Sequence, residues 1–210
     1  MKTLKMQFYN NVNPSLKKYI SHYWTTSGDL NDKKPFQLIP MDHVDITVPL
    51  NGSYIFELKG QATLVNKSIF HGLRDSTITV SQNKSLDSFG ISFTPWGFYY
   101  LYKDSLHLIN NKILYLSQLD TQLNEVINRC IESHSPIADM IEAIESYLIS
   151  HYKTSKHYTE SIEIIEDYIN TPLDSVKEYC QLKNVQRKKL ERIFKKYVGL
   201  SPKEFKARSK

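Results

Sequence analysis

Cysteine is scarce in this sequence of 210 residues, which contains only Cys130 and Cys180. The two lie far apart, and each sits among apolar residues with helical spacing. No CxxC pair is present, so a cysteine-ligated metal site has no support in the sequence. We expect both thiols to be free and buried in a reducing compartment, and a disulfide between them is the less favoured alternative.

Long apolar runs are also missing. No stretch approaches the ~20 apolar residues that a helix needs to span a bilayer. The opening residues, MKTLKMQFYNN, lack the apolar core of a secretory signal peptide. Apolar residues nevertheless make up 40% of the chain, which is typical of a globular protein. We expect a cytoplasmic, folded protein with no membrane partner.

Recognisable catalytic motifs are absent from the sequence. It contains no glycine-rich phosphate loop and no G-x-S-x-G elbow, and none of its seven histidines forms an i, i+4 pair with glutamate. Asp42, His43 and Asp45 could bind a metal in a barrel mouth, but a polar cluster at the edge of a strand is the favoured interpretation. We predict a protein that is not an enzyme, with no catalytic residue, cofactor or metal. A small β-barrel enzyme that carries a metal or cofactor is a distant alternative.

Strand signals fill roughly the first hundred residues. Apolar side chains recur at every second position in 44–48 and 54–58, and Asn51-Gly52 between them predicts a hairpin turn. Further strand candidates lie at 62–65, 68–71, 77–81 and 88–93. Short strands separated by turn residues predict an all-β sandwich or barrel.

Helical spacing replaces this pattern from residue 99 onward. Apolar stripes predict helices over 119–130 and 137–148, and Ser135-Pro136 can open the second of them. Residues 152–160 include a polar, unpatterned stretch that predicts a linker. The expected fold class is α+β, with an all-β barrel or sandwich and packed helices over 1–151, followed by an all-α helix-turn-helix domain over 161–210.

Positive charge is concentrated at the carboxyl end. The net charge is +5, yet residues 183–210 hold eleven Lys and Arg against Glu191 and Glu204, so the rest of the chain carries −4. A basic end on an acidic body is what a DNA-contacting region attached to a non-DNA domain would show.

The same region has the spacing of a helix, a tight turn and a second helix. Ser175 and Glu178 predict a capping box at the first helix, and Asn184 suits a left-handed turn residue. The second helix should bury Leu190, Ile193, Phe194 and Tyr197, which are spaced three and four apart. Its basic residues would then face outward, as in a helix that enters the major groove.

These residues carry a family resemblance. The stretch N-V-Q-R-K-K-L-E-R-I-F-K-K-Y-V-G-L-S-P-K-E-F resembles the first helix-turn-helix of the AraC/XylS transcription regulators. The matching positions are Leu190, Arg192, Phe194, Lys195, Lys196, Gly199, Ser201, Pro202 and Phe205. Asn184 and Gln186 depart from the pattern, because the family usually has glycine and a capping serine there. Gln186 is a poor N-cap, so the second helix should fray at its start or be capped in another way.

The first half of the chain is similar to the β-rich amino-terminal domain of such regulators, in Y-I-S-H-Y-W, I-P-M-D-H-V-D-I-T-V-P-L, H-G-L and F-G-I-S-F-T-P-W-G-F. In the family this domain implies effector sensing, dimerisation or both, so a small-molecule effector and a homodimer are expected partners besides double-stranded DNA. The family usually continues with a second helix-turn-helix. We therefore expect either a chain truncated after the first unit or a natural protein with a single reading unit. In both cases the chain should bind DNA weakly unless it dimerises.

The resemblance also implies which residues meet DNA. The expected DNA-binding residues are Gln186, Arg187, Lys188, Glu191, Arg192, Lys195 and Lys196. Lys188 and Arg192 suit guanine O6 and N7, and Glu191 can accept from a cytosine amino group. Arg187, Lys195 and Lys196 suit phosphates. Arg192 could instead pair with Glu191 or Glu178 and serve only the fold.

Aromatic residues of the β region could line a ligand pocket, because such pockets are concave and rich in aromatic side chains. The candidates are Tyr54, Phe56, Trp96 and Tyr100, although core packing would explain each of them as well. The sequence thus predicts an AraC-type transcription regulator. The alternative is a regulatory protein-interaction or dimerisation module that does not read DNA by itself.

Overall fold

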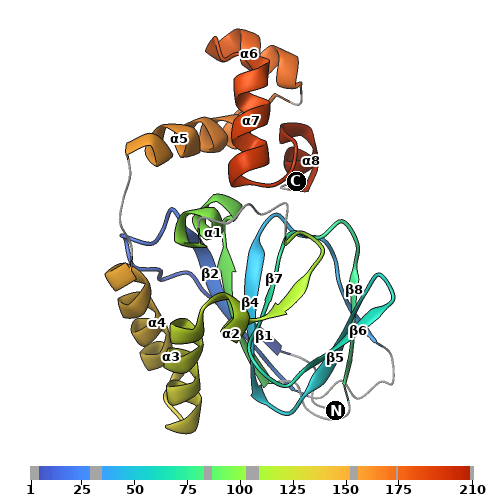
Figure 1. Cartoon of the computed structure of the whole chain (residues 1–210), viewed down its shortest axis with the longest axis vertical. Helices are drawn as coiled ribbons and strands as arrows, with labels where there is room; N and C mark the ends of the chain where they lie inside the picture. Colours follow the sequence, from blue (N-terminus) through green and yellow to red (C-terminus); the bar gives the residue numbers. More distant parts are fainter. Residues whose placement is uncertain are drawn as a thin grey trace.

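The computed structural model describes residues 5–28, 35–82, 87–102, 109–151, 156–173 and 175–208. The strands gather in one β-rich unit, with the helical residues 156–208 stacked at one end and the helices of residues 121–151 along one side (Figure 1). Among these described residues, no helix is both long and apolar enough to cross a bilayer.

Six strands form the larger sheet: β1 (Lys5–Tyr9), β2 (Ile20–Ser27), β4 (Val44–Asn51), β7 (Ile69–His71), β9 (Asp87–Phe93) and β10 (Ile113–Tyr115). They pair antiparallel in the order β1-β2-β9-β4-β7-β10. The central strands β4 and β9 supply core residues that include Val44, Ile46, Phe89 and Ile91, all fully buried. The expected strands at 44–48, 68–71 and 88–93 are therefore confirmed.

The smaller sheet has the order β3-β8-β5-β6 and contains β3 (Phe36–Leu38), β5 (Tyr54–Leu58), β6 (Gln61–Val65) and β8 (Ile78–Gln82). Its described strands pair only with one another, so the two sheets form an antiparallel, sandwich-like unit. Of the two architectures the sequence left open, the described strands form the sandwich and not a closed barrel.

The predicted hairpin around Asn51-Gly52 is wrong. Gly52 does adopt a positive φ of 80°, but β4 and β5 belong to different sheets and do not pair. Pro49 lies where the β4–β9 register shifts, because proline has no N–H for the ladder. The turn therefore carries the chain from one sheet to the other. The hairpin lies one turn later, where Lys59 and Gly60 both have positive φ and connect β5 to β6.

Helices pack along one side of the sandwich. After α1 (Pro95–Tyr102), the short strand β10 interrupts the helical pattern that was expected from residue 99 onward. The predicted helices are confirmed as α3 (Thr121–Glu132) and α4 (Ile137–His151), preceded by the single turn α2 (Leu116–Leu119). The Glu145 carboxylate of α4 accepts from the hydroxyl of Tyr23 on β2, which ties this helix to the larger sheet.

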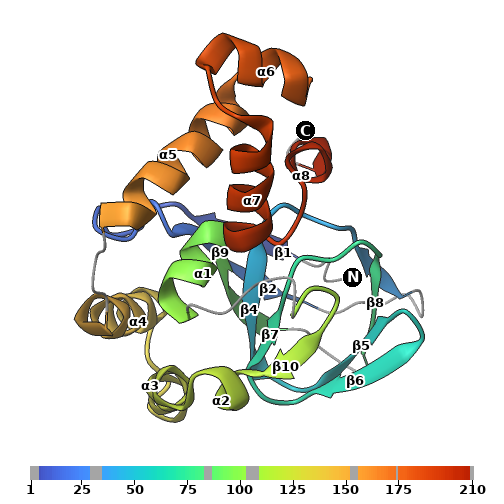
Figure 2. The ribbon, with the colours of Figure 1, turned by 45° about the horizontal axis from the view of Figure 1, so that its top comes forward.

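Four helices follow: α5 (Lys156–Asn170), α6 (Val176–Lys183), α7 (Arg187–Tyr197) and α8 (Pro202–Arg208). Of the linker expected at 152–160, residues 152–155 lie outside the described residues, and residues 156–160 form the start of α5. Figure 2 shows α7 standing between α6 and α1, with α8 beside it. Ile165, Tyr168, Leu190 and Phe194 are fully buried and form the centre of this helical group.

The helical group rests directly on the β-rich unit. Tyr99 of α1 packs edge-on against Tyr197 of α7, with ring centroids 4.7 Å apart. The side-chain amide of Asn110 donates to the carbonyl of Gly199 at 3.2 Å, and Arg208 Nη1 donates to the carbonyl of Arg74 at 2.6 Å. Residues from the β unit thus hold both α7 and α8 in place.

Candidate functional site

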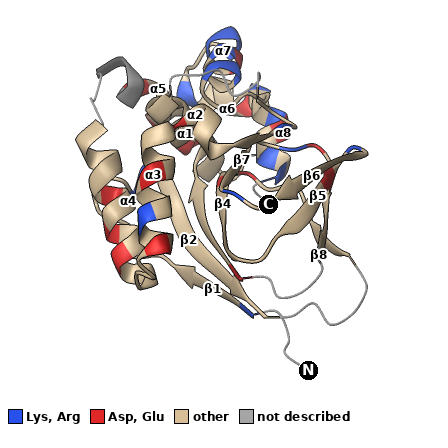
Figure 3. Ribbon diagram, turned by 60° about the horizontal axis from the view of Figure 1, so that its bottom comes forward, with Lys and Arg blue, Asp and Glu red and all other residues tan. Residues whose placement is uncertain are grey.

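The first candidate surface is the outward face of α7. Leu190, Ile193, Phe194 and Tyr197 are buried, as predicted, and they hold the helix against its neighbours. The seven residues expected to contact DNA are all exposed: Gln186, Arg187, Lys188, Glu191, Arg192, Lys195 and Lys196. Figure 3 shows Lys and Arg gathered on α7 and α8, whereas Asp and Glu account for most of the charged segments of α3 and α4. The basic carboxyl-terminal segment and the acidic helices that were distinguished in the sequence therefore also lie in different parts of the structure.

The turn before α7 is built by residue types that suit it. The Ser175 hydroxyl accepts from the backbone N–H of Glu178 at 3.3 Å at the start of α6. Asn184 adopts the predicted left-handed conformation, with φ 51° and ψ 40°. Gln186 is the N-cap of α7 and makes no side-chain capping bond, as its residue type predicts.

Three charged side chains of α7 make contacts within the protein. Arg187 Nε donates to Glu191 Oε1 at 2.8 Å, and this bond raises the pKa of Arg187. Glu191 therefore pairs with Arg187, and the alternative pairing with Arg192 is not formed. Lys196 Nζ lies 5.0 Å from the ring centroid of Tyr197 and 5.8 Å from that of Tyr99, so it sits where α7 meets α1.

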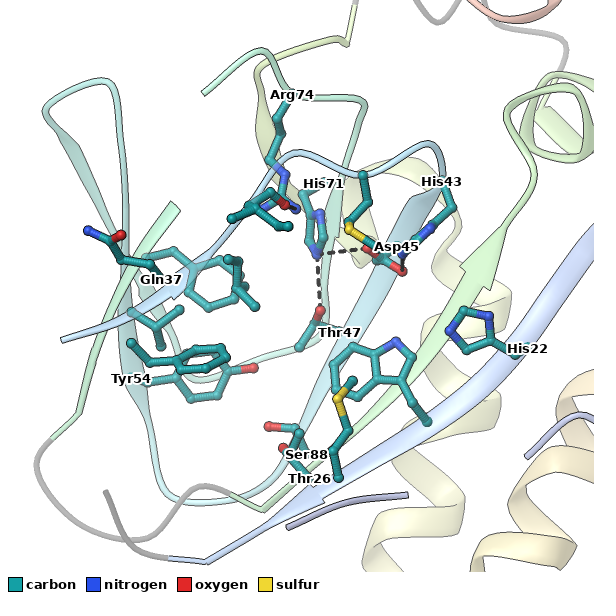
Figure 4. A pocket seen from close by; sticks show the side chains of 18 of the residues that line it. His22, Thr26, Gln37, His43, Asp45, Thr47, Tyr54, His71, Arg74 and Ser88 are labelled. Carbon is teal, nitrogen blue, oxygen red and sulfur yellow. Dashed lines mark hydrogen bonds and ion pairs between the residues drawn. The ribbon is translucent and has the colours of Figure 1, made fainter. Parts of the chain in front are cut away.

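The second candidate site is a pocket of about 350 Å³ between the two sheets, shown in Figure 4. Tyr54 and Phe56 line it, and both are also packed in the buried core of the smaller sheet, so the two interpretations given for them meet here. Trp96 and Tyr100 do not line the pocket, because they lie on α1 outside the sandwich. Trp96 Nε1 donates to the Lys18 carbonyl there. The ring of Tyr100 stacks on Tyr19 at 4.7 Å.

A buried polar cluster forms one wall of this pocket. Ser92 Oγ donates to Asp45 Oδ1 at 2.5 Å, and His43 Nε2 and His71 Nε2 lie 3.6 and 3.8 Å from the same carboxylate. Thr47 Oγ1 lies 3.2 Å from His71 Nε2. The predicted strand-edge cluster is wrong in this respect, since Asp45 is buried on β4, between β7 and β9.

Burial and charge shift the pKa values in this cluster in opposite directions. Burial raises the pKa of Asp45, but His43, His71, Ser92 and Arg74 outweigh it, and the net shift is downward. Burial lowers the pKa of His71 to about 4, so this imidazole is neutral at pH 7. Burial also lowers the pKa of His43, but Asp45 and Asp42 reverse the effect, and its net shift is upward. Among the described residues, no group of three or more His, Cys, Asp and Glu side chains is arranged to hold a metal.

Arg74 is the pocket residue that sequence reasoning missed. Its side chain is buried, with Nη2 donating to the Ile39 carbonyl at 3.1 Å. Nη1 is buried without a hydrogen-bond partner within the described part of the chain. A buried guanidinium is costly unless it is paired, and it becomes a binding feature only when the fold shows that it lines a cavity. An arginine in a turn gives no such signal in the sequence.

Trp24 was likewise not predicted as a pocket residue. It lies beside Gly90 on the neighbouring strand, where an added Cβ would overlap the indole ring. Glycine at this position therefore lets the indole lie against β9 and form part of the pocket wall. The pairing of β2 with β9, which is distant in sequence, creates this contact.

Comparison with known proteins gives a limited picture. A family model described as a domain of unknown function (DUF6597) matches residues 12–114, and no curated protein matches the chain. Among solved structures, the AraC-like transcriptional activator CuxR is 15% identical, covers 91% of this chain and 80% of its own, and has a TM-score of 0.36. ToxT from Vibrio cholerae is 10% identical with 99% of both chains covered and a TM-score of 0.29. The Clostridium difficile EutQ protein is 9% identical, covers 44% of this chain and 64% of its own, and has a TM-score of 0.35. At these identities and TM-scores, the likenesses assign no function to the chain.

Proposed function

We propose that this chain is a DNA-binding transcription regulator of AraC type, in which α6 and α7 form the helix-turn-helix and the β-rich unit binds a small effector. The observation that carries the proposal is the placement of α7. Four buried apolar side chains anchor one face of this helix, while its cationic face is exposed. An exposed, basic helix on a rigid apolar backing suits insertion into the major groove.

The roles of the basic residues follow from their positions. Lys188 and Arg192 are exposed and would donate to guanine O6 and N7, which gives sequence discrimination. Lys195 would bind phosphate, where charge suffices without base geometry. Arg187 and Glu191 already pair with each other, so we expect Arg187 to orient Glu191 toward a cytosine amino group.

The pocket between the sheets supports the effector part of the proposal. Small-molecule sites are concave and mostly apolar, with a few placed polar groups, and their volumes are roughly 300–1,000 Å³. The cavity of about 350 Å³ has this character. One α7 makes few phosphate contacts, so we also expect two copies of the chain to bind neighbouring half-sites.

A selection experiment tests the DNA-binding proposal. The full chain would be used to enrich duplexes from a random library, and affinity for the enriched sequence would then be measured by fluorescence anisotropy at several salt concentrations. Arg192→Gln should weaken binding to the enriched duplex by about 5- to 100-fold, with a much smaller effect on random duplex. Lys195→Gln should weaken both to a similar degree and reduce the salt dependence.

Lys67→Gln is the matched control, because Lys67 is exposed on the β-rich unit away from α7. It should leave the affinity unchanged. If no sequence is enriched and Arg192→Gln behaves like Lys67→Gln, the DNA-reading role is rejected. The module that acts only through protein contacts would then be favoured. Nanomolar binding by a proven monomer at physiological salt would reject only the expectation that two copies of the chain bind neighbouring half-sites. It would leave the DNA-binding role of α7 intact.

A further inference from the structure

The pocket between the sheets has a polar group at each end and apolar walls between them. From this arrangement we propose that it binds a small, mostly apolar carboxylic acid, whose carboxylate is held by Arg74 and whose opposite end carries a hydroxyl group that faces Tyr54, Ser88 and Thr26. This inference names the class of effector and so rests on the proposed function.

The side chains that form the walls of the pocket favour a ligand whose central part is apolar. Trp24, Phe56, Leu38 and Val80 supply aromatic and aliphatic surface around the cavity. Large apolar side chains continue to the rim, where the exposed residues Met6, Phe8, Phe36, Ile39 and Met41 also line the pocket. A sugar or nucleotide would leave many of its polar groups without partners against such walls, whereas an aryl or alkyl body would be desolvated favourably.

Arg74 supplies the cationic end. Its guanidinium has one protein acceptor, the Ile39 carbonyl on Nη2, and Nη1 has none within the described residues. A carboxylate is the acceptor that best matches two guanidinium N–H groups in a fixed fork. Figure 4 shows the guanidinium reaching toward His71 at the upper side of the pocket.

Asp45 does not already fill this role. Its carboxylate is within 4 Å of His43 and His71 and accepts from Ser92, and no ion pair between it and Arg74 is formed among the described residues. Asp45 still acts on Arg74 at longer range, and burial lowers the pKa of Arg74 while the Asp45 carboxylate raises it. The net shift of the Arg74 pKa is downward, so Asp45 offsets only part of the cost of burying the cation, and Nη1 stays available to a ligand.

Three hydroxyl groups form the other end. Thr26 Oγ1, Tyr54 Oη and Ser88 Oγ are buried, and none has a hydrogen bond of acceptable geometry within the described part of the chain. Ser88 nevertheless lies close enough to Tyr54 to favour its ionised form slightly, although burial raises the pKa of Tyr54 far more. Figure 4 shows Tyr54 pointing into the cavity, with Ser88 and Thr26 together at its lower side. A ligand hydroxyl can both donate and accept there, which removes the cost of unsatisfied groups.

Calorimetric titration of the full chain tests the proposal without any DNA in the assay, so its failure is distinct from failure of the DNA-binding role. The probe is 4-hydroxycinnamate, with a Kd expected on the order of 10–100 μM for a ligand of this size. The matched probes are cinnamate, which lacks the hydroxyl, and 4-hydroxycinnamyl alcohol, which lacks the carboxylate. Each should bind about 10-fold or more weakly, and inorganic phosphate should not bind.

Two variants assign the ends of the ligand. Arg74→Gln should reduce the affinity for 4-hydroxycinnamate about 10- to 100-fold, while Arg129→Gln on the exposed face of α3 should not change it. Tyr54→Phe should abolish most of the preference for 4-hydroxycinnamate over cinnamate.

If Arg74→Gln does not fold, the comparison of acid and alcohol on the unmodified chain still decides whether a carboxylate is recognised. The proposal is overturned if the alcohol binds as tightly as the acid, if folded Arg74→Gln binds like the unmodified chain, or if no acid of the set binds at millimolar concentration.

Discussion

At the scale of single residues, His71 carries a pH-dependent contribution to stability. Burial lowers its pKa to about 4 in the folded protein, against 6.5 for the ordinary group. Between these values the unfolded chain binds a proton that the folded protein does not. The free energy of unfolding should therefore fall by about 3 kcal/mol as pH drops from 6.5 to 4, from this residue alone. Asp45, His43 and Arg74 face it, and their charges are included in this shift.

The His71→Gln variant isolates that contribution. Denaturant unfolding of both proteins between pH 7 and pH 4 should show a smaller loss of stability on acidification in the variant. Identical slopes in the two proteins would show that folding does not shift the pKa of His71. Because the two proteins are compared at each pH, the titration of His22 and His43 affects both in the same sense.

Replacing tyrosine by phenylalanine should change the free energy of unfolding differently at Tyr54 and at Tyr23. The Tyr54 hydroxyl is buried without a hydrogen bond in the described residues, so Tyr54→Phe should leave the free energy of unfolding within about 0.5 kcal/mol or raise it. Tyr23 donates to Glu145 at 3.2 Å and is fully buried, so Tyr23→Phe should lower it by about 1.5–3 kcal/mol. Equal losses in urea unfolding would mean that Tyr54 has a partner in solution.

At the scale of elements, the turn between α6 and α7 depends on Asn184. Its left-handed φ of 51° is costly for most residues with a Cβ, but not for glycine. We expect Asn184→Gly to be nearly neutral, and Asn184→Ala to destabilise by about 1 kcal/mol in thermal unfolding. If both variants have the same stability, the turn does not keep this conformation in solution.

Lys206 fixes two helices together. Its Nζ donates to the carbonyls of Tyr168, Thr171 and Leu173 at the end of α5, at 3.1, 2.5 and 2.6 Å. Lys206→Met should lower the free energy of unfolding by about 2–3 kcal/mol, because these carbonyls lose a charged donor. Lys203→Met is the control on the same helix, since Lys203 is exposed and its loss should change stability by less than about 0.5 kcal/mol. Similar losses in both variants would contradict this role.

The sequence predicted most elements because their signals are local. The apolar spacing of residues 190–197 lies within one helix, and so does the N-cap bond of Ser175 in α6. The reciprocal bond from the Ser175 backbone to the Glu178 side chain, which would complete the predicted capping box, is not formed among the described residues. The hairpin prediction at Asn51-Gly52 failed because a turn motif does not say which strands it joins. Here β5 pairs with β6 and β8 in the other sheet and not with β4. Strand β10 was missed because three residues are too few for a period to show.

At the scale of the whole molecule, the pocket could be predicted only in part. Tyr54 and Phe56 were chosen for their aromatic side chains, and the alternation of β5 places both of them in the lining of the cavity. Arg74 and Trp24 were not predicted as pocket residues, because they come together in the cavity only through the pairing of strands that are distant in sequence. Trp96 and Tyr100 were assigned to the pocket on residue type alone, and the position of α1 outside the sandwich excludes them.

The bond from Arg208 to the Arg74 carbonyl predicts a measurable effect on how the two units hold together. Arg208→Met removes this contact, so backbone amides of α8 should exchange with deuterium about 5-fold faster or more, as expected for the loss of about 1 kcal/mol. Lys203→Met should leave exchange unchanged. Equal exchange in both variants would show that aromatic packing of Trp96 on Phe205 is sufficient to hold α8.

Arg74 lines the cavity with its guanidinium and accepts the bond from Arg208 of α8 with its carbonyl, so one residue contacts both the pocket and the helical group. Thermodynamic reciprocity applies to such a shared residue. Any factor by which an occupant of the cavity changes the affinity for an operator must also be the factor by which the operator changes the affinity for that occupant. Under the proposed function, the chain would therefore hold its effector with a different affinity when bound to an operator than when free in solution.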